Sequence, residues 1–243
     1  MSISAFKIAN KLITGQGAIE QLDAELARLQ ISNPLIVTDA ILVKSGTVDL
    51  ALAHLGGRAY RIFDEVQPEP EIAIVQACTQ AYRAGGHDGL IGLGGGSAID
   101  IAKAVAAFAG HEGALEELFG VDQVQRKGPP LIAIPTTAGT GSEVTNVAIL
   151  SDKVAQLKKG IVSDYLLPDV ALVSPVMTLT CPRSVTAASG VDALVHAVES
   201  YLSLNGSPIT DSLALGAIRL IVRALPKAYA NPANLQARED MAT

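Results

Sequence analysis

The chain has 243 residues, of which 49% are hydrophobic and 17% are charged, and its formal net charge at pH 7 is −6. This length and apolar content suit one large or two modest globular domains, and an acidic chain without a Lys/Arg block is not expected to bind nucleic acid. No apolar run reaches the roughly 18 residues of a membrane span, and no secretory signal opens the chain. The two cysteines, Cys78 and Cys181, are too few for a disulfide framework and indicate a cytoplasmic protein.

Short apolar runs bounded by turn residues alternate with amphipathic stretches from the N-terminus onward. The apolar runs predict strands buried on both faces, at residues 34–38, 59–63, 89–93, 131–135 and 170–174. The stretches between them predict helices at residues 18–30, 45–55, 71–84 and 98–109. This alternation is typical of an α/β protein with a doubly wound parallel sheet.

Beyond Cys181 and Pro182 the pattern predicts helices only, at residues 184–202, 209–229 and from Asn231 onward, where Asn-Pro is a good helix start. The helix from Ile209 is apolar on nearly every side, and so few short helices cannot cover it. The chain also ends in a helical pattern without a Gly or Pro stop. We therefore expect an N-terminal part of a longer protein, with an α/β domain over residues 1–180 and the first helices of a truncated helical domain over residues 181–243.

A glycine loop, GLGGGS at residues 92–97, lies between a predicted strand and a predicted helix. Glycines there let the backbone approach a ligand, and the free N–H groups and positive dipole of a helix start attract phosphate. The loop is neither GxGxxG nor a Walker loop, so a simple tight turn is the alternative interpretation. Asp100 falls in the first turn of the following helix, where we expect it to act as a cap.

A second polar loop, PTTAGTGSEVT at residues 135–145, follows the next strand. Its hydroxyl groups can donate hydrogen bonds to a phosphate or a ribose, although a structural Ser/Thr-rich turn has the same composition.

Asp39 follows the strand predicted at residues 34–38. A carboxylate at the carboxyl end of a strand can accept hydrogen bonds from the ribose hydroxyls of NAD and would repel the 2′-phosphate of NADP. The alternative is an aspartate that merely starts a loop. Because Asp39 precedes the glycine loop, the usual Rossmann order of these features is not present.

The segment GVDALVHAVE at residues 190–199 places Asp192 and His196 four residues apart, on one face of a helix. A carboxylate and an imidazole so placed can bind one divalent metal ion. The alternative is a helix-capping aspartate and a core histidine. The other histidines, His54, His87 and His111, all lie in the first half of the chain, so the sequence shows half of a metal site.

Taken together, these segments resemble the iron-containing (group III) alcohol dehydrogenases, which share a fold with dehydroquinate synthase and glycerol dehydrogenase. The matching segments are GGGSAID at 94–100, PTTAGTGSEVT at 135–145, KKGIVSDYLLPDVALVSP at 158–175 and TAASGVDALVHAVESY at 186–201. The resemblance implies an α/β dinucleotide-binding domain followed by an all-helical metal-binding domain, with the active site in the cleft between them.

The resemblance also implies the site residues. Those for the cofactor NAD are Asp39, Gly94, Gly95, Gly96, Ser97, Thr136, Thr137, Lys158 and Leu179. Among them, the glycine loop holds the pyrophosphate and Leu179 packs near the adenosine. The family's metal, Fe²⁺ or a substituting Zn²⁺, has one Asp and three His ligands, of which Asp192 and His196 match the first two. The other two histidines are expected beyond Thr243.

The implied function is NAD-dependent and metal-dependent interconversion of small primary alcohols or diols and aldehydes by hydride transfer. The 243 residues alone are expected to be inactive. The alternatives are a hydroxyacid–oxoacid transhydrogenase, a maleylacetate reductase, in which the loop TTAGTGSE usually differs, and a non-catalytic nucleotide-binding module. The expected partners are an alcohol or aldehyde substrate and further copies of the chain in a dimer or larger homo-oligomer, without nucleic acid or membrane.

Overall fold

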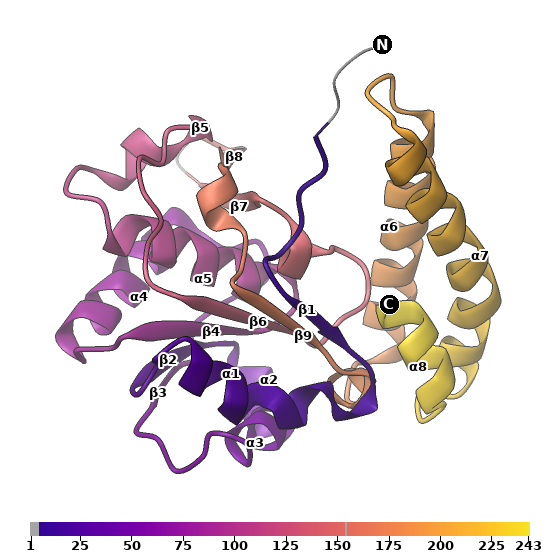
Figure 1. The fold of residues 1–243 in the computed structure, drawn as a ribbon, viewed down its shortest axis with the longest axis horizontal. Helices are drawn as coiled ribbons and strands as arrows, with labels where there is room; N and C mark the ends of the chain where they lie inside the picture. The colour runs from indigo at the N-terminus through magenta and orange to yellow at the C-terminus, as the bar shows by residue number, and fades with distance from the viewer. Residues whose placement is uncertain (1–4, 154) are drawn as a thin grey trace.

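The computed structural model describes residues 5–153 and 155–243. A six-stranded sheet forms the centre of its α/β part (Figure 1), and all pairings between its strands are parallel. The strand order is β1 (Leu12–Thr14), β9 (Val170–Val173), β6 (Leu131–Pro135), β4 (Gly89–Gly94), β2 (Pro34–Val37) and β3 (Arg61–Phe63). The predicted parallel sheet is thus confirmed, although the strand predicted at residues 59–63 is shorter and the edge strand β1 was not predicted.

Helices cover both faces of this sheet (Figure 1). On one face, Leu35 and Val37 of β2 pack with α4 (Ile72–Ala84) and α5 (Gly96–Ala109). On the other, Ile36 packs with α1 (Leu22–Arg28) and α3 (Thr47–Leu52). Successive side chains of a strand point to opposite faces, so a strand covered on both sides must be apolar throughout.

Two predicted helices differ from the structure in their extent. The segment predicted at residues 18–30 begins as a 3-10 helix, η1 (Gln16–Gln21), before α1. The helix predicted at residues 45–55 is confirmed as the shorter α3, and the chain forms one more helix before it, α2 (Ala40–Lys44), which we did not predict. Gly46 lies between them with φ +75°, a left-handed conformation that ends a helix and that glycine adopts readily.

A small second sheet, which we did not predict, lies over α5. It contains β5 (Gly120–Val121), β8 (Leu157–Val162) and β7 (Val147–Asp152), and the last two pair as an antiparallel hairpin. Ala148 and Leu150 of β7 are buried in the core that includes α5. The 3-10 helices η2 (Leu115–Leu118), η3 (Ser142–Val144), η4 (Asp164–Leu166) and η5 (Pro175–Thr178) connect the remaining elements.

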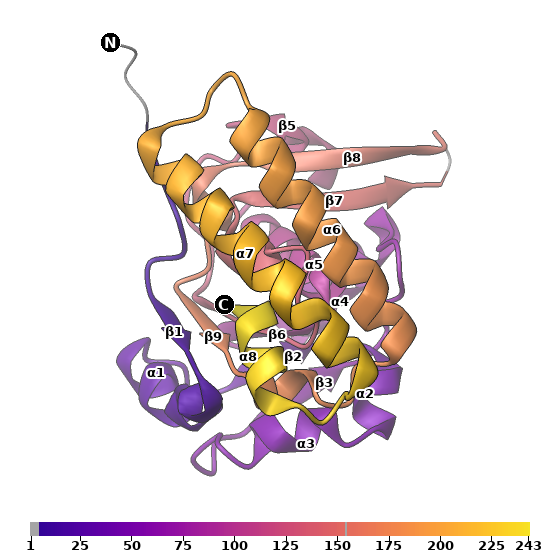
Figure 2. The ribbon, with the colours of Figure 1, turned by 90° about the vertical axis from the view of Figure 1, so that its right-hand side faces the viewer.

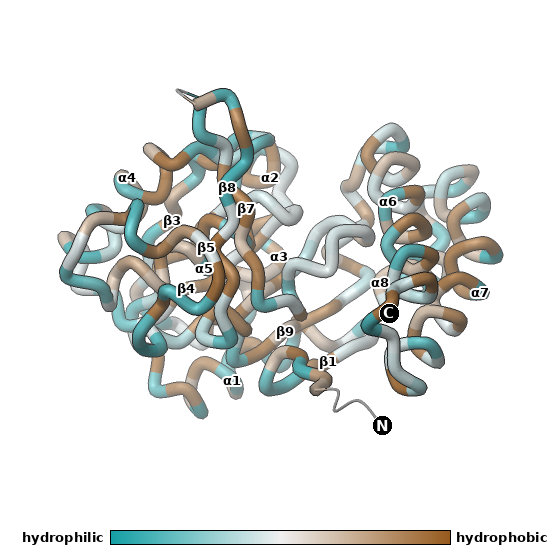
Figure 3. The backbone as a smooth tube through the Cα atoms, turned by 90° about the horizontal axis from the view of Figure 1, so that it is seen from above, coloured by the Kyte–Doolittle hydropathy of each residue, from teal (hydrophilic) through white to brown (hydrophobic). Residues whose placement is uncertain are grey.

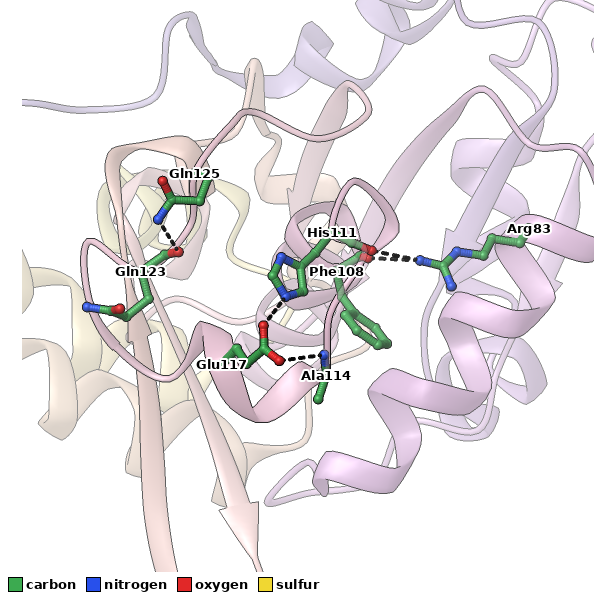
Figure 4. A network of polar contacts seen from close by, with 7 residues as sticks. All are labelled: Arg83, Phe108, His111, Ala114, Glu117, Gln123 and Gln125. Atoms are coloured by element: carbon green, nitrogen blue, oxygen red, sulfur yellow. Dashed lines mark hydrogen bonds and ion pairs between the residues drawn. The ribbon is translucent and has the colours of Figure 1, made fainter.

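The carboxyl end of α5 is held by a network of polar contacts (Figure 4). Arg83 of α4 donates to the carbonyl oxygens of Phe108 and His111 at 3.1 and 3.4 Å. His111 Nε2 lies 3.1 Å from a carboxylate oxygen of Glu117, whose other oxygen accepts from the Ala114 amide. A guanidinium group at this end stabilises the helix dipole, and the opposite end of α5 begins at the glycine loop.

The last part of the chain is helical, with α6 (Arg183–Leu202), α7 (Pro208–Ala230) and α8 (Leu235–Ala242). The helices predicted at residues 184–202 and 209–229 are confirmed as α6 and α7, which lie side by side (Figure 2). The predicted start of the last helix is wrong. Asn231 ends α7, and Asn234 caps α8 instead, accepting a hydrogen bond from the Ala237 amide at 3.0 Å.

Apolar residues recur along α6 and α7 (Figure 3), and several of them are exposed, as expected. Helix α7 buries Ala214, Ile221 and Ala224, whereas Leu213 is 56% and Val222 is 61% exposed. Among the described residues, no helix is long and apolar enough to cross a membrane.

Candidate active site

Three loops leave the carboxyl ends of neighbouring parallel strands. Asp39 follows β2, the glycine loop ends β4, and the Thr loop, which we define as residues 136–141, follows β6. The register pairs Val37 with Gly92 and Gly94 with Pro135, so the three loops lie at one edge of the sheet. The strand order reverses between β2 and β4, and such a switch point is where open α/β sheets bind ligands.

The glycine loop forms the start of α5, which begins at Gly96, two residues earlier than predicted. Gly94 has φ +154°, and a Cβ there would lie 2.8 Å from the Cβ of Ala98. At Gly95, by contrast, a Cβ would make only ordinary contacts, the nearest at 3.5 Å from Thr137 Oγ1. Gly95 is the N-cap of α5 and makes no side-chain cap, so amides of the first turn remain able to bind an anion.

The Thr loop lies against the glycine loop. The Thr136 amide donates to the Gly94 carbonyl oxygen at 2.9 Å, and the Thr136 side chain is buried. Thr137 lies beside Gly95 and faces a cavity. Thr136 therefore supports the glycine loop from within, whereas Thr137 is accessible to a ligand.

Asp39 is the N-cap of α2. One oxygen of its carboxylate, Oδ1, accepts from the amides of Ile41 and Leu42 at 2.8 and 2.9 Å. The other, Oδ2, lies 4.0 Å from the position of a Gly94 Cβ. The carboxylate thus caps a helix and also lies beside the glycine loop.

Asp192 and His196 lie on one face of α6, as their spacing predicts. His196 Nε2 is 3.7 Å from Asp192 Oδ1, and the two side chains are 54% and 46% exposed. A core histidine and a capping aspartate are both excluded, because His196 is exposed and Asp192 lies in the middle of the helix. Within residues 5–153 and 155–243, no group of three or more His, Cys, Asp or Glu side chains could hold a metal. The pair offers two ligands.

One cavity of about 690 Å³ joins residues from several of these elements. Its lining includes Gly96 and Ser97 of the glycine loop, Lys158 of β8, and Asp192 and His196 of α6. Lys158 Nζ lies 3.5 Å from Glu69 Oε1, but both side chains are exposed, and such an ion pair adds little stability. The ammonium group is therefore able to turn toward a ligand.

His196 also lines a second cavity, of about 370 Å³. Thr137 and Gly139 of the Thr loop line it together with residues of α7 and α8. Leu179 lies outside both cavities, at the end of η5, and its side chain is 36% exposed. Of the predicted residues, Gly96, Ser97, Thr137, Lys158 and Asp192 share a cavity with His196. Asp39, Gly94, Gly95, Thr136 and Leu179 line neither of these two cavities.

Two buried charged residues of α5, Asp100 and Lys103, bind the hairpin of β7 and β8, a role that we did not predict. Asp100 does not cap α5, because its Oδ2 accepts from the Ile149 amide of β7 at 3.0 Å. Lys103 is fully buried, and its Nζ donates to Thr145 O, Thr145 Oγ1 and Val147 O at 2.8, 3.0 and 3.0 Å. Burial lowers the pKa of Lys103 to about 8, and burial also raises the pKa of Asp100.

These contacts fasten α5 to the hairpin that carries Lys158, since Lys158 pairs with Ser151 of β7. The sequence did contain a signal for a buried lysine, because Lys103 is the lone charge within the apolar run IAKAVAAF.

Comparisons with known proteins give the same architecture. The family model for iron-containing alcohol dehydrogenase matches residues 9–175, and that for the C-terminal part of the family matches residues 186–243. The long-chain-alcohol dehydrogenase 1 of Geobacillus thermodenitrificans is 47% identical over 233 residues, which cover 94% of this chain and 58% of the relative.

Solved structures agree. A 1,3-propanediol oxidoreductase superposes with a TM-score of 0.96 at 39% identity, over 99% of this chain and 64% of the other. The NAD⁺ complex of a sulfoacetaldehyde reductase from Bifidobacterium kashiwanohense superposes with a TM-score of 0.91 at 32% identity, over 100% of this chain and 65% of the other. The chain therefore spans less than two thirds of these relatives, and it belongs to the iron-containing alcohol dehydrogenase family.

Proposed function

We propose that the protein is an NAD-dependent, metal-dependent alcohol dehydrogenase that interconverts small primary alcohols or diols and aldehydes by hydride transfer. The observation that supports this proposal most directly is the cavity that Gly96, Ser97 and Lys158 share with Asp192 and His196. Groups suited to an anionic cofactor and groups suited to a metal ion border the same space. The names of the relatives, among them a 1,3-propanediol oxidoreductase and an NAD⁺ complex, support this class of substrate and cofactor.

In this proposal, residues 1–180 form the dinucleotide-binding domain and residues 181–243 the first helices of the metal-binding domain. The backbone amides of Gly96 and Ser97 at the start of α5 bind the pyrophosphate, because no side chain caps this helix and its dipole is positive at this end. Asp39 accepts hydrogen bonds from the ribose. The remaining cofactor contacts come from Gly94, Gly95, Gly96, Ser97, Thr136, Thr137, Lys158 and Leu179.

Asp192 and His196 suit a divalent ion as two of its ligands. They supply a carboxylate oxygen and an imidazole nitrogen from one helix face, the donor types that bind Fe²⁺ and Zn²⁺. When bound, such an ion supplies Lewis-acid catalysis. The two side chains orient it toward the cavity, and Lys158, which lines the same cavity, adds a positive charge near the glycine loop.

We also propose a homo-oligomer in a reducing compartment such as the cytoplasm. The exposed apolar residues of α6 and α7, including Val191 and Leu213, support association with further copies. The free thiols of Cys78 and Cys181 support a reducing environment. Light scattering tests the first statement.

The test of the activity is the substitution His196→Ala in the complete gene product, with His54→Ala as a control. Metal content and metal-dependent NAD reduction with small alcohols should fall together in the first variant, because one ligand is removed. Both should persist in the second, since His54 lies after α3 and outside the cavity. Unchanged metal content and turnover in His196→Ala would contradict the proposal.

A further inference from the structure

The connection between the α/β part and α6, residues 179–182, is bound from both sides. Thr180 Oγ1 lies 2.6 Å from the hydroxyl of Thr47, a buried residue at the start of α3. The next residue, Cys181, accepts a hydrogen bond through its carbonyl oxygen from Nη2 of Arg238 on α8, at 3.3 Å. Consecutive residues of the connection are thus tied to opposite parts of the molecule.

Arg238 is a buried arginine, with 4% of its surface exposed. Besides the contact with Cys181, its Nε donates to the Pro232 carbonyl oxygen at 3.1 Å and its Nη1 donates to Thr186 Oγ1 at 2.9 Å. All three acceptors are neutral. A buried charge is expensive unless its hydrogen bonds are well made, so this guanidinium group favours one arrangement of the segments that it joins.

Those segments decide where α6 points. Thr186 lies in the first turn of α6, and α8 packs on η5 of the α/β part. His196 is ten residues further along α6, or about 15 Å at the rise of an α-helix. A tilt of roughly 10° at Thr186 would therefore displace His196 by about 2.6 Å, and displacements of about 1 Å in an active site already reduce rates strongly.

We propose that Arg238 is a positioning residue that fixes the direction of α6 and thereby the place of Asp192 and His196 relative to the glycine loop. Its catalytic consequence rests on the proposed function. The hydrogen bonds themselves, and the rigidity that they give to the connection, do not depend on that function.

The two cysteines provide a direct measurement. Cys78 is fully buried, and burial raises the pKa of its thiol to about 12, so it is unreactive in the folded protein. Cys181 is half-buried and lies in the connection itself. The rate at which a disulfide reagent such as DTNB labels Cys181, with the labelled site identified by mass spectrometry, therefore reports opening of the connection.

The variants are Arg238→Met, which keeps an unbranched apolar stem without the donors, Arg238→Lys, which keeps the charge, and Arg223→Met as a control. Arg223 is an exposed arginine of α7 that also bonds to α8, through Asp240. We expect Arg238→Met to speed labelling of Cys181 by about tenfold or more, because charge-assisted hydrogen bonds that hold the segment are lost. Arg238→Lys should give an intermediate rate and Arg223→Met none of the increase.

In the complete gene product, kcat should fall in Arg238→Met while the KM for NAD⁺ stays unchanged, since the glycine loop lies in the α/β part. A lower melting temperature with an unchanged labelling rate and kcat would make Arg238 merely structural and overturn the proposal. If Arg238→Met does not fold, the labelling rate of Arg238→Lys decides by the same criterion. Failure of the proposed function would instead appear as absent metal-dependent turnover in the unsubstituted protein.

Discussion

A Cβ on Gly139 would lie only 2.5 Å from the backbone carbonyl oxygen of Ser189. Gly139 belongs to the Thr loop beside the proposed cofactor site, and Ser189 lies on α6, three residues before Asp192. The loop and the helix therefore touch at backbone distance. At Gly139, therefore, no side chain fits between the Thr loop and the helix that carries the proposed metal ligands.

We expect Gly139→Ala to lower the free energy of unfolding by about 1–3 kcal/mol, because the added methyl group forces the loop and α6 apart. Gly216→Ala is the matched control. A Cβ at Gly216 meets nothing within 4 Å, and alanine is the better helix former. Urea unfolding of both variants measures the difference. Equal stability of Gly139→Ala and the parent would show that the loop and α6 can separate at no cost in stability.

Gly95→Val should weaken NAD⁺ binding by about tenfold or more while the protein stays folded, since a branched side chain would occupy the space of the phosphate. The structure leaves room for the first carbon of that side chain, whose nearest neighbour is Thr137 Oγ1 at 3.5 Å. Calorimetric titration gives the affinity and a thermal melt checks the fold. Full affinity in a folded variant would mean that the loop is only a turn.

Asp39→Asn should reduce the preference for NAD⁺ over NADP⁺ by roughly 10- to 100-fold, the equivalent of one charged hydrogen bond. Asparagine also caps helices well, so α2 keeps the hydrogen bonds that Asp39 now makes to Ile41 and Leu42. Titration with each cofactor measures the ratio. Asp49→Asn, at an exposed site on α3, should leave the ratio unchanged.

Lys103 predicts a specific pH dependence of stability. Burial lowers its pKa from 10.5 to about 8, so between these values the unfolded chain holds a proton that the folded protein has lost. The free energy of unfolding should therefore rise with pH relative to Lys103→Met, by up to about 1.4 kcal/mol per pH unit between pH 8 and 10.5. Below pH 8 the difference should be constant. Denaturant unfolding at pH 7, 8, 9 and 10 tests this, and a flat difference above pH 8 would contradict it.

The parallel sheet was predictable because its strands are covered on both faces and carry continuous apolar runs, such as LIAIP in β6. The edge strand β1 has the mixed burial of a strand with one open side and gives no such run. The hairpin of β7 and β8 is likewise half exposed. Its strand β8 begins with LKKG, a composition that propensity does not assign to a sheet.

The candidate site likewise has a part that the sequence predicts and a part that it does not. Asp192 and His196 are close because of local helix geometry, and their spacing alone predicts that. Asp100 and Lys103 bond to backbone groups of Ile149, Thr145 and Val147, more than 40 residues further along the chain. Such partners depend on where the hairpin packs, which no periodicity in α5 can indicate.

The hairpin has a consequence for insertions and deletions in this protein. Lys158 reaches the cavity because it stands opposite Ser151 in the ladder of β7 and β8. Side chains alternate between the faces of a strand, so a slip of one position would turn Lys158 away and bring Leu157 or Lys159 in its place. The turn between the strands can therefore vary in length only where the pairing of these strands is preserved. A shift by one residue within β8 would instead put Leu157 or Lys159 in the place of Lys158 at the proposed cofactor site, without any substitution in the sequence.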